Sequence, residues 1–354
     1  MADDSLDHPA ALAAADPGGM LSLAGRLGSQ LRGGFEAGRR AAGLPSGEGI
    51  RAVGLCGMGG SGVGGDILRS LFAERLPVPV VVSKGYAVPE FFGKDTLVVA
   101  SSFSGNTEET LAAYAEAVSR GCRVVTVSAG GDLAERSRID GVAHVRLPDN
   151  VPVPRAALGY LSAAPVGILE GVGLIPPMSH EVEQAAALLD DLAGRLGPER
   201  PSAENEAKSL AVWLAGRTPV IWGSEGLAEA PAVRWKTQVN ENAKAPAFAS
   251  VLPELDHNEI EGWSEGSGRD YGLVILRHPL EHPRIQPRVV ATLGAVAVSG
   301  LEGREVWAAG AASLEILFSL IMKGDFASTY LAILRGVDPT PIPVLTGLKQ
   351  RLRD

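Results

Sequence analysis

The chain has 354 residues, of which 45% are hydrophobic and 21% charged, a balance typical of globular proteins. Its length predicts about two domains. The net charge of −9 argues against a nucleic-acid-binding surface. We find no stretch long and apolar enough to span a membrane, and the acidic N-terminus lacks a signal-peptide pattern. We therefore expect a cytoplasmic protein that binds neither nucleic acid nor a membrane.

The first 47 residues are predicted to be helical, because Leu21, Leu23, Leu27 and Leu31 recur on one helical face. From Ile50 onward, strand-like runs alternate with helical runs. The expected strands are Ala52–Cys56, Val78–Ser83, Thr96–Ser101, Arg123–Ser128 and Val142–Leu147, and the expected helices are Gly62–Leu76 and Asn106–Arg120. This alternation predicts a parallel sheet covered by helices on both faces. Cys56 and Cys122 fall in apolar runs without metal-ligand spacing, so we expect reduced core cysteines.

A second series of strands and helices follows a helix over Ala156–Leu174, a polar helix ending near Leu196 and a hinge at 197–202. Its expected strands are Thr218–Trp222, Tyr271–Leu276 and Glu305–Ala308, and its helices Leu227–Asn240, Arg284–Val298 and Ser313–Leu334. The predicted organisation is thus an N-terminal helical arm (1–47), a first α/β domain (48–196) and a second α/β domain with a C-terminal tail (197–354).

Two loops of the first series have the composition of an anion site. The glycine-rich loop Gly57–Gly62 follows the first strand, and the hydroxyl-rich loop Ser101–Thr107 follows the third. Glycines let the backbone approach a ligand, and free N–H groups at a helix start attract anions. Ser102, Ser104 and Thr107 add hydroxyl donors. These loops predict a site for a small phosphorylated molecule, whereas Glu225 in the corresponding loop of the second series would repel a phosphate.

Two other interpretations of these loops are weaker. The glycines at 57, 59 and 62 match a dinucleotide-binding fingerprint, but that fold needs an acidic residue after the next strand. Here that strand ends with Ser83 and Lys84. Helix capping could explain one hydroxyl residue, but not three with a glycine and an asparagine. For Ser61 alone, a turn residue is as good an explanation as a ligand contact.

Four further residues carry little weight singly. Arg155 and Lys349 could be solvated surface cations, and Glu241, at a helix end, a surface carboxylate. His257 lies among acidic residues that could hold or charge its imidazole, or it could be a polar loop histidine. His278 and His282 are interrupted by prolines, which disfavours a metal-binding pair.

Together these residues resemble the bifunctional phosphoglucose/phosphomannose isomerases of the sugar isomerase (SIS) domain superfamily, over essentially the whole chain. Six motifs carry the resemblance and occur in the order of the family: Gly57–Asp66, Ser101–Thr110, Pro154–Gly159, Asn240–Ala245, Asp256–Trp263 and Leu348-Lys349. The first two of these motifs are typical of any SIS domain, and the last four point to this family. The resemblance implies two SIS-type domains, each a mostly parallel sheet flanked by helices in a three-layer sandwich.

The resemblance also implies roles for individual residues. Gly60 and Ser61 match one substrate loop, and Ser102, Ser104 and Thr107 match the phosphate-binding loop. Arg155 matches the arginine that stabilises the enediolate, and Glu241 the base that moves a proton between C1 and C2. His257 and Lys349 match groups implicated in ring opening, with the histidine supplied by the second subunit of a homodimer that shares its active sites. No metal and no cofactor are implied.

The predicted activity is interconversion of glucose 6-phosphate or mannose 6-phosphate with fructose 6-phosphate. Two alternatives stay open. A non-catalytic phosphosugar-binding protein would use the same loops, although such proteins usually carry an effector domain and this acidic chain has no sign of a DNA-binding one. An isomerase of another phosphosugar would share every motif of the first domain.

Overall fold

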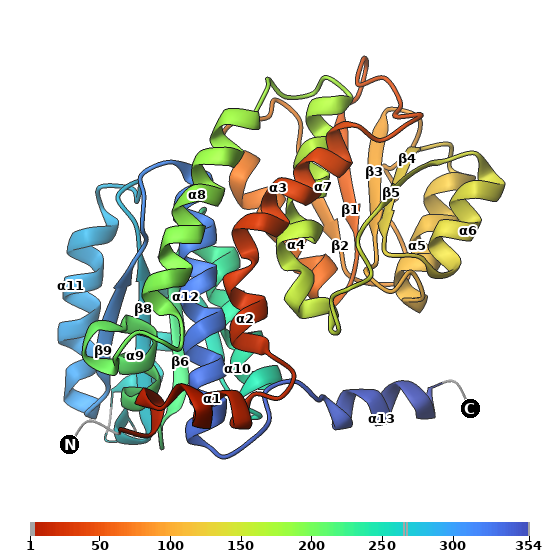
Figure 1. Ribbon diagram of the computed structural model, residues 1–354. Helices are drawn as coiled ribbons and strands as arrows, with labels where there is room; N and C mark the ends of the chain where they lie inside the picture. Colours follow the sequence, from red (N-terminus) through yellow and green to blue (C-terminus); the bar gives the residue numbers. More distant parts are fainter. Residues whose placement is uncertain (1–3, 265, 267, 353–354) are drawn as a thin grey trace. The chain divides into compact units, whose positions relative to one another are not determined.

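The computed structural model describes residues 4–264, 266 and 268–352 and contains two parallel β-sheets flanked by helices, as predicted (Figure 1). The first sheet has the order β2-β1-β3-β4-β5 and the second the order β7-β6-β8-β9. The strands are β1 (Ala52–Cys56), β2 (Val80–Ser83), β3 (Thr96–Ser101), β4 (Arg123–Ser128), β5 (Ala143–Arg146), β6 (Thr218–Ser224), β7 (Phe248–Leu252), β8 (Tyr271–Arg277) and β9 (Glu302–Trp307). The predicted three-layer α/β fold is confirmed.

The helices lie between and after these strands. They are α1 (Pro9–Ala15), α2 (Met20–Gly25), α3 (Leu27–Arg39), α4 (Gly59–Phe72), α5 (Glu108–Ser119), α6 (Gly131–Asp140), α7 (Leu158–Gly171), α8 (Ser179–Leu196), α9 (Glu206–Leu214), α10 (Glu229–Asn242), α11 (Ile285–Val296), α12 (Ser313–Leu334) and α13 (Pro343–Arg351). Three short 3₁₀ helices bear on the site, η2 (Pro154–Ala157), η4 (Glu254–His257) and η5 (Glu259–Trp263).

The chain forms two compact units. One comprises residues 26–190 and 310–318 and holds the first sheet; the other comprises residues up to 25, 191–309 and 319 onward and holds the second. The N-terminal segment is tied to the second-sheet unit, where the Ser202 backbone N–H donates to Asp7 Oδ1 (2.8 Å). The domain borders expected at residues 47 and 196 stay predictions.

In the first-sheet unit, α5 and α6 cover one face of the sheet and α4 and α7 the other (Figure 1). Cys56 and Val98 pack with Tyr114 of α5 and Leu133 of α6. Burial raises the pKa of the Cys56 thiol to about 12, so this free cysteine is an inert core residue, as expected. On the other face α3 packs closely on α7, because a Cβ at Gly38 would lie 2.1 Å from the Ala164 carbonyl oxygen.

In the second-sheet unit, α11 lies on one side of the sheet and α10 and α12 on the other (Figure 1). Trp222, Ile275 and Val289 belong to the core beneath α11. On the opposite side the Arg234 guanidinium of α10 donates to the Asp325 carboxylate of α12 (2.9 and 3.0 Å). Both side chains are almost fully buried, so the pair joins the two helices within the core.

The expectation that no stretch of the chain is long and apolar enough to span a membrane is wrong. Helix α12 has 22 residues and a mean hydropathy of 1.4 over its most apolar 18-residue window, which by length and composition could cross a membrane. In the structure 94% of that window is buried. A central core helix meets the same test as a membrane span because it is also surrounded by apolar side chains.

Candidate active site

The two loops predicted to bind an anion lie at the switch point of the first sheet. Strand β1 has β2 on one side and β3 on the other, and Cys56, the last residue of β1, is paired with Ala100 of β3. In open α/β sheets, ligands bind in the crevice outside the carboxyl ends of the strands at such a point. The Gly57–Gly62 and Ser101–Thr107 loops both begin there.

The glycine-rich loop passes into a helix earlier than predicted. Helix α4 begins at Gly59 rather than Gly62, with Gly59 in the left-handed region (φ +52°), so Ser61 lies in the first helical turn. Ser61 is 4% exposed. A Cβ at Gly57 would lie 2.9 Å from the Ser101 carbonyl oxygen. The absence of a side chain therefore lets the two loops touch.

Arg155 is adjacent to the glycine-rich loop. It lies in η2, and a Cβ at Gly60 would be 3.2 Å from the Pro154 carbonyl oxygen and 3.5 Å from the Arg155 Cα. Arg155 is only 3% exposed, so the interpretation of this arginine as a solvated surface residue is wrong. Burial restricts the rotamers open to this long side chain.

The hydroxyl-rich loop is organised around Ser102. Its Oγ lies 2.8 Å from Thr107 Oγ1 and accepts the Gly105 N–H (3.1 Å), whereas Ser104 is exposed. Thr107 is the N-cap residue of α5, yet its side chain makes no capping hydrogen bond. Simple capping therefore does not account for Thr107. The helix start favours an anion, although Glu108 and Glu109 in the first turn oppose one.

The sequence analysis counted Asn106 among the polar residues of this loop that suit an anion, but its side chain instead connects the loop to α6. Asn106 Oδ1 accepts the Asp132 N–H at the start of α6 (2.9 Å). Gly105 adopts φ +74°, and a Cβ there would lie 1.8 Å from the Gly130 carbonyl oxygen. Helix α6, which the sequence analysis missed, thus sets the position of the loop.

Lys84 is a residue of the site region to which the sequence analysis gave no role. It follows β2 and forms an ion pair with Asp66 of α4, and its Cε would be 3.2 Å from a Cβ at Gly62. The structure thus adds a cation beside the first turn of α4. The sequence feature that could have identified Lys84 as a site residue is its position: it follows β2, where a dinucleotide-binding fold has an acidic residue.

Glu241 lies in the last turn of α10 and is half-buried. The turn that follows is fixed by its neighbours. Lys244, at φ +52°, donates from Nζ to the backbone carbonyls of Glu241 (2.6 Å) and Pro339 (3.0 Å). Asn240 Nδ2 donates to the Ala245 carbonyl (2.8 Å). The Asn240–Ala245 motif therefore holds the backbone around Glu241.

His257 ends η4 and is exposed. Among the residues that the structure describes, its ring has no hydrogen-bond or ion-pair partner. The nearby acidic residues have other partners: Glu254 binds Asn258, Asp256 binds Arg288, and Glu259 binds Trp222. The interpretation that these acids hold the imidazole is therefore wrong.

Glu241 lies near the amino ends of the strands of the second sheet, and His257 lies near their carboxyl ends. Helix α10 ends before β7 begins, and η4 follows the end of β7. The five residues of β7 (Phe248–Leu252) span about 13 Å at the usual rise per residue. Lys349 lies exposed on α13, a helix with no buried residue. Gly60, Ser61, Ser102, Ser104, Thr107 and Arg155 belong to the first-sheet unit, and Glu241, His257 and Lys349 to the second.

The switch point of the second sheet differs from that of the first. Glu225 follows β6 and is exposed. Arg277, at the end of β8, is 1% exposed and binds the carboxylates of Glu281 (2.8 Å) and Glu305. Internal ion pairs thus occupy the carboxyl edge of this sheet. Within the described part of the chain, no cluster of three or more His, Cys, Asp or Glu side chains could hold a metal ion.

The fold and the paired loops define an α/β protein of the phosphosugar-isomerase class. The family described as "Bacterial phospho-glucose isomerase C-terminal SIS domain" matches residues 203–352. The C-terminal domain of glucosamine-fructose-6-phosphate aminotransferase from Francisella tularensis has a similar fold, with a TM-score of 0.65 at 15% identity, covering 91% of this chain and 98% of that one.

Two curated relatives carry the comparison further. A bifunctional phosphoglucose/phosphomannose isomerase of Caldicellulosiruptor bescii is 37% identical over 93% of this chain and 97% of its own length. A D-glucosamine-6-phosphate 4-epimerase of Sulfolobus acidocaldarius is 30% identical over 66% of this chain and 71% of its own. The chain belongs to the bifunctional phosphoglucose/phosphomannose isomerase family.

Proposed function

We propose that this protein interconverts glucose 6-phosphate or mannose 6-phosphate with fructose 6-phosphate through an enediolate, without a metal or other cofactor. The observation that carries the proposal is the meeting of the Gly57–Gly62 and Ser101–Thr107 loops at the carboxyl edge of the first sheet, in a chain of this family. Such loops suit the phosphate of a small sugar.

The substrate phosphate is proposed to bind the second loop and the start of α5. Ser102, Ser104 and Thr107 supply hydroxyl donors, and the Glu108–Ser119 helix supplies backbone N–H groups at its start. Gly60 and Ser61 contact the sugar from the first turn of α4. The net charge of −9 makes these local donors necessary, because the overall field of the protein disfavours a phosphate.

The reaction begins with opening of the sugar ring. The C1–O5 bond breaks and the proton of the C1 hydroxyl is transferred to O5, which leaves an aldehyde at C1. His257 and Lys349 are proposed to move these protons. The His257 imidazole is exposed and has no hydrogen-bond or ion-pair partner within the described residues, which leaves both ring nitrogens available to the substrate.

Isomerisation follows by proton transfer between carbons. Glu241 takes the proton from C2, the electron pair forms a C1–C2 double bond, and the C1 oxygen gains negative charge. Arg155 stabilises this oxyanion. A proton then moves from O2 to O1 as Glu241 returns its proton to C1, which gives the ketose. Both C2 epimers are accepted if Glu241 can reach the C2 hydrogen on either side.

The active form is proposed to be a cytoplasmic homodimer with shared sites. The separation of Glu241 and His257 by the length of β7 supports this, since one chain presents them at opposite edges of its second sheet. Two copies related by a twofold axis can exchange such residues reciprocally. His257 of each subunit then serves the site that contains the Glu241 of its partner.

The test is a coupled assay in EDTA, with glucose 6-phosphate and mannose 6-phosphate offered separately and fructose 6-phosphate detected. Turnover of both supports the proposal. Glu241→Gln should lower kcat by about 10²–10⁴-fold, because a positioned base contributes this much, while KM changes little. Glu302→Gln, at an exposed glutamate of β9, serves as the matched control for loss of a carboxylate charge. Near wild-type turnover by Glu241→Gln would refute the assignment of the base.

A second candidate comes from the relative named D-glucosamine-6-phosphate 4-epimerase. Glucosamine 6-phosphate therefore belongs in the substrate panel, with detection of galactosamine 6-phosphate. Phosphosugar binding without turnover of any panel member would instead support a non-catalytic binding protein.

A further inference from the structure

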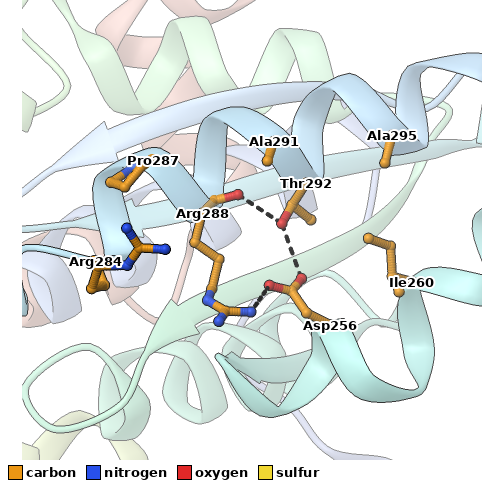
Figure 2. Close-up of a pocket in the computed structure, with 8 residues that line it drawn as sticks. All are labelled: Asp256, Ile260, Arg284, Pro287, Arg288, Ala291, Thr292 and Ala295. Carbon is orange, nitrogen blue, oxygen red and sulfur yellow. Dashed lines mark hydrogen bonds and ion pairs between the residues drawn. The ribbon is translucent and has the colours of Figure 1, made fainter.

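The segment that carries His257 is fastened to the second-sheet unit on its N-terminal side by Asp256. Its carboxylate accepts a hydrogen bond from Arg288 Nη1 at Oδ2 (2.9 Å) and another from Thr292 Oγ1 at Oδ1 (3.0 Å). Figure 2 shows this carboxylate between the two side chains of α11, at the edge of a pocket lined by Ile260 and Ala295. The Asp256 side chain is 9% exposed. Two charged or polar donors thus fix η4 to α11.

On the C-terminal side the same segment is fastened by Glu259. Its Oε1 accepts the indole N–H of Trp222 (2.9 Å), and its Oε2 accepts the hydroxyl of Ser250. Trp222 lies on β6 and is fully buried, and Ser250 lies on the neighbouring strand β7. The second anchor therefore reaches the centre of the sheet.

The residue between the anchors completes the arrangement. Asn258 Oδ1 accepts the Glu259 N–H (2.6 Å), and Asn258 Nδ2 donates to Glu254 Oε1 (3.0 Å). In the sequence Asp256-His-Asn-Glu259, the side chains of Asp256 and Glu259 thus bind the scaffold, and that of Asn258 binds within the segment itself. The fourth, His257, is exposed, and within the described residues it has no hydrogen-bond or ion-pair partner.

We propose that Asp256 and Glu259 are positioning residues that hold the His257 ring where it meets the substrate. This inference rests on the proposed function of His257. Hydrogen bonds to ionised groups are roughly twice as strong as neutral ones, so the paired carboxylate anchors add to the packing of Leu255, which is buried in the core of this unit. The two acids act on the backbone that carries His257.

The kinetic test compares Asp256→Asn and Glu259→Gln with wild type. Each amide keeps an oxygen acceptor but loses the charge, so the anchor is loosened while its shape is retained. We expect kcat to fall about tenfold for each, because small misplacements of a reacting group are costly, with KM within about twofold. The matched control is Glu302→Gln, which loses an ion pair with Arg217 (3.3 Å) at the other edge of the sheet and should leave kcat unchanged.

A double-mutant cycle separates positioning from general damage. In a His257→Ala background, Asp256→Asn should cost no further activity, because the residue that it positions is gone. An equal loss in both backgrounds would overturn the inference, as would wild-type kcat in both amide variants while His257→Ala is impaired.

Hydrogen exchange gives a readout that does not depend on the reaction. Amides of residues 254–264 should exchange at least tenfold faster in Asp256→Asn than in wild type or Glu302→Gln, since local opening becomes easier. Unchanged exchange would overturn the anchoring itself. If instead the wild type fails to turn over any sugar phosphate but the exchange difference is found, the proposed function fails and the anchoring stands.

Discussion

His278 is a buried histidine whose protonation can be followed through stability. It lies just beyond β8 with Nε2 3.3 Å from Ser224 Oγ, and burial lowers its pKa. In the unfolded chain an imidazole has a pKa of about 6.5. Below that pH the unfolded state binds a proton that the native state does not, so the free energy of unfolding falls as the pH drops from 7 to 5.

We therefore predict that His278→Asn flattens the dependence of the free energy of unfolding on pH. The measurement is urea unfolding at pH 5, 6 and 7, with His180→Asn on the exposed surface of α8 as a control. An unchanged slope in His278→Asn would contradict the prediction. The comparison of slopes is independent of any uniform loss of stability caused by the smaller side chain.

At the scale of elements, the hydroxyl-rich loop depends on Gly105. Ala at this position would combine a strained φ with a clash against the Gly130 carbonyl. Gly121, at φ +72°, has no atom within 4 Å of its would-be Cβ, so Gly121→Ala isolates the backbone strain. We predict a loss of about 1 kcal/mol for Gly121→Ala and about 3 kcal/mol for Gly105→Ala.

Equilibrium unfolding checks these values, and steady-state kinetics adds the functional consequence. Gly105→Ala should also raise KM for the sugar phosphate severalfold, because the loop that holds Ser102 and Thr107 must move. Equal stability of the two variants would mean that the Gly130 backbone moves away from the added Cβ without lowering the free energy of unfolding.

The sequence was sufficient to predict the strands with apolar runs and the two loops at the switch point. It missed β7 because this strand at the edge of its sheet is only half-buried along most of its length. It missed α6 because Leu133 and Ser137 are the buried residues of this polar helix, which leaves little periodicity to detect. Helix α13, with no buried residue, has no such signal at all.

Contacts between distant residues were beyond prediction for a different reason. The sequence shows that acidic residues flank His257, but it does not show what they bind. Asp256 binds Arg288, 32 residues away, and Glu259 binds Trp222, 37 residues away. Only the fold determines that these carboxylates point toward the scaffold rather than the imidazole. The burial of Arg155 likewise follows from the packing of η2 against α4 and not from its local sequence.

For the whole molecule, shared sites predict that two inactive variants restore activity to each other. Glu241→Gln and His257→Ala, unfolded together and refolded as a mixture, should form hybrids in which one site carries both lesions and the other neither. Random pairing makes half of the dimers hybrid, so the mixture should reach about a quarter of wild-type activity.

The control is a mixture of Glu241→Gln with Glu241→Ala, two changes at one position that no hybrid dimer can complement, refolded alongside each variant alone. A His257→Ala mixture that stays as inactive as its components would exclude a shared site and place both residues in one chain's own site. The result is read from initial rates, after size-exclusion chromatography has shown that the variants form dimers.

The length of β7 also bears on how activity scales with the amount of protein. If each chain carries two half-sites that are separated by β7, an isolated chain has no complete active site. Below the dissociation constant of the pair, the concentration of working sites rises with the square of total protein, so specific activity declines on dilution. A cell that makes little of this protein would then lose flux more than proportionally, and a rise in expression would be amplified.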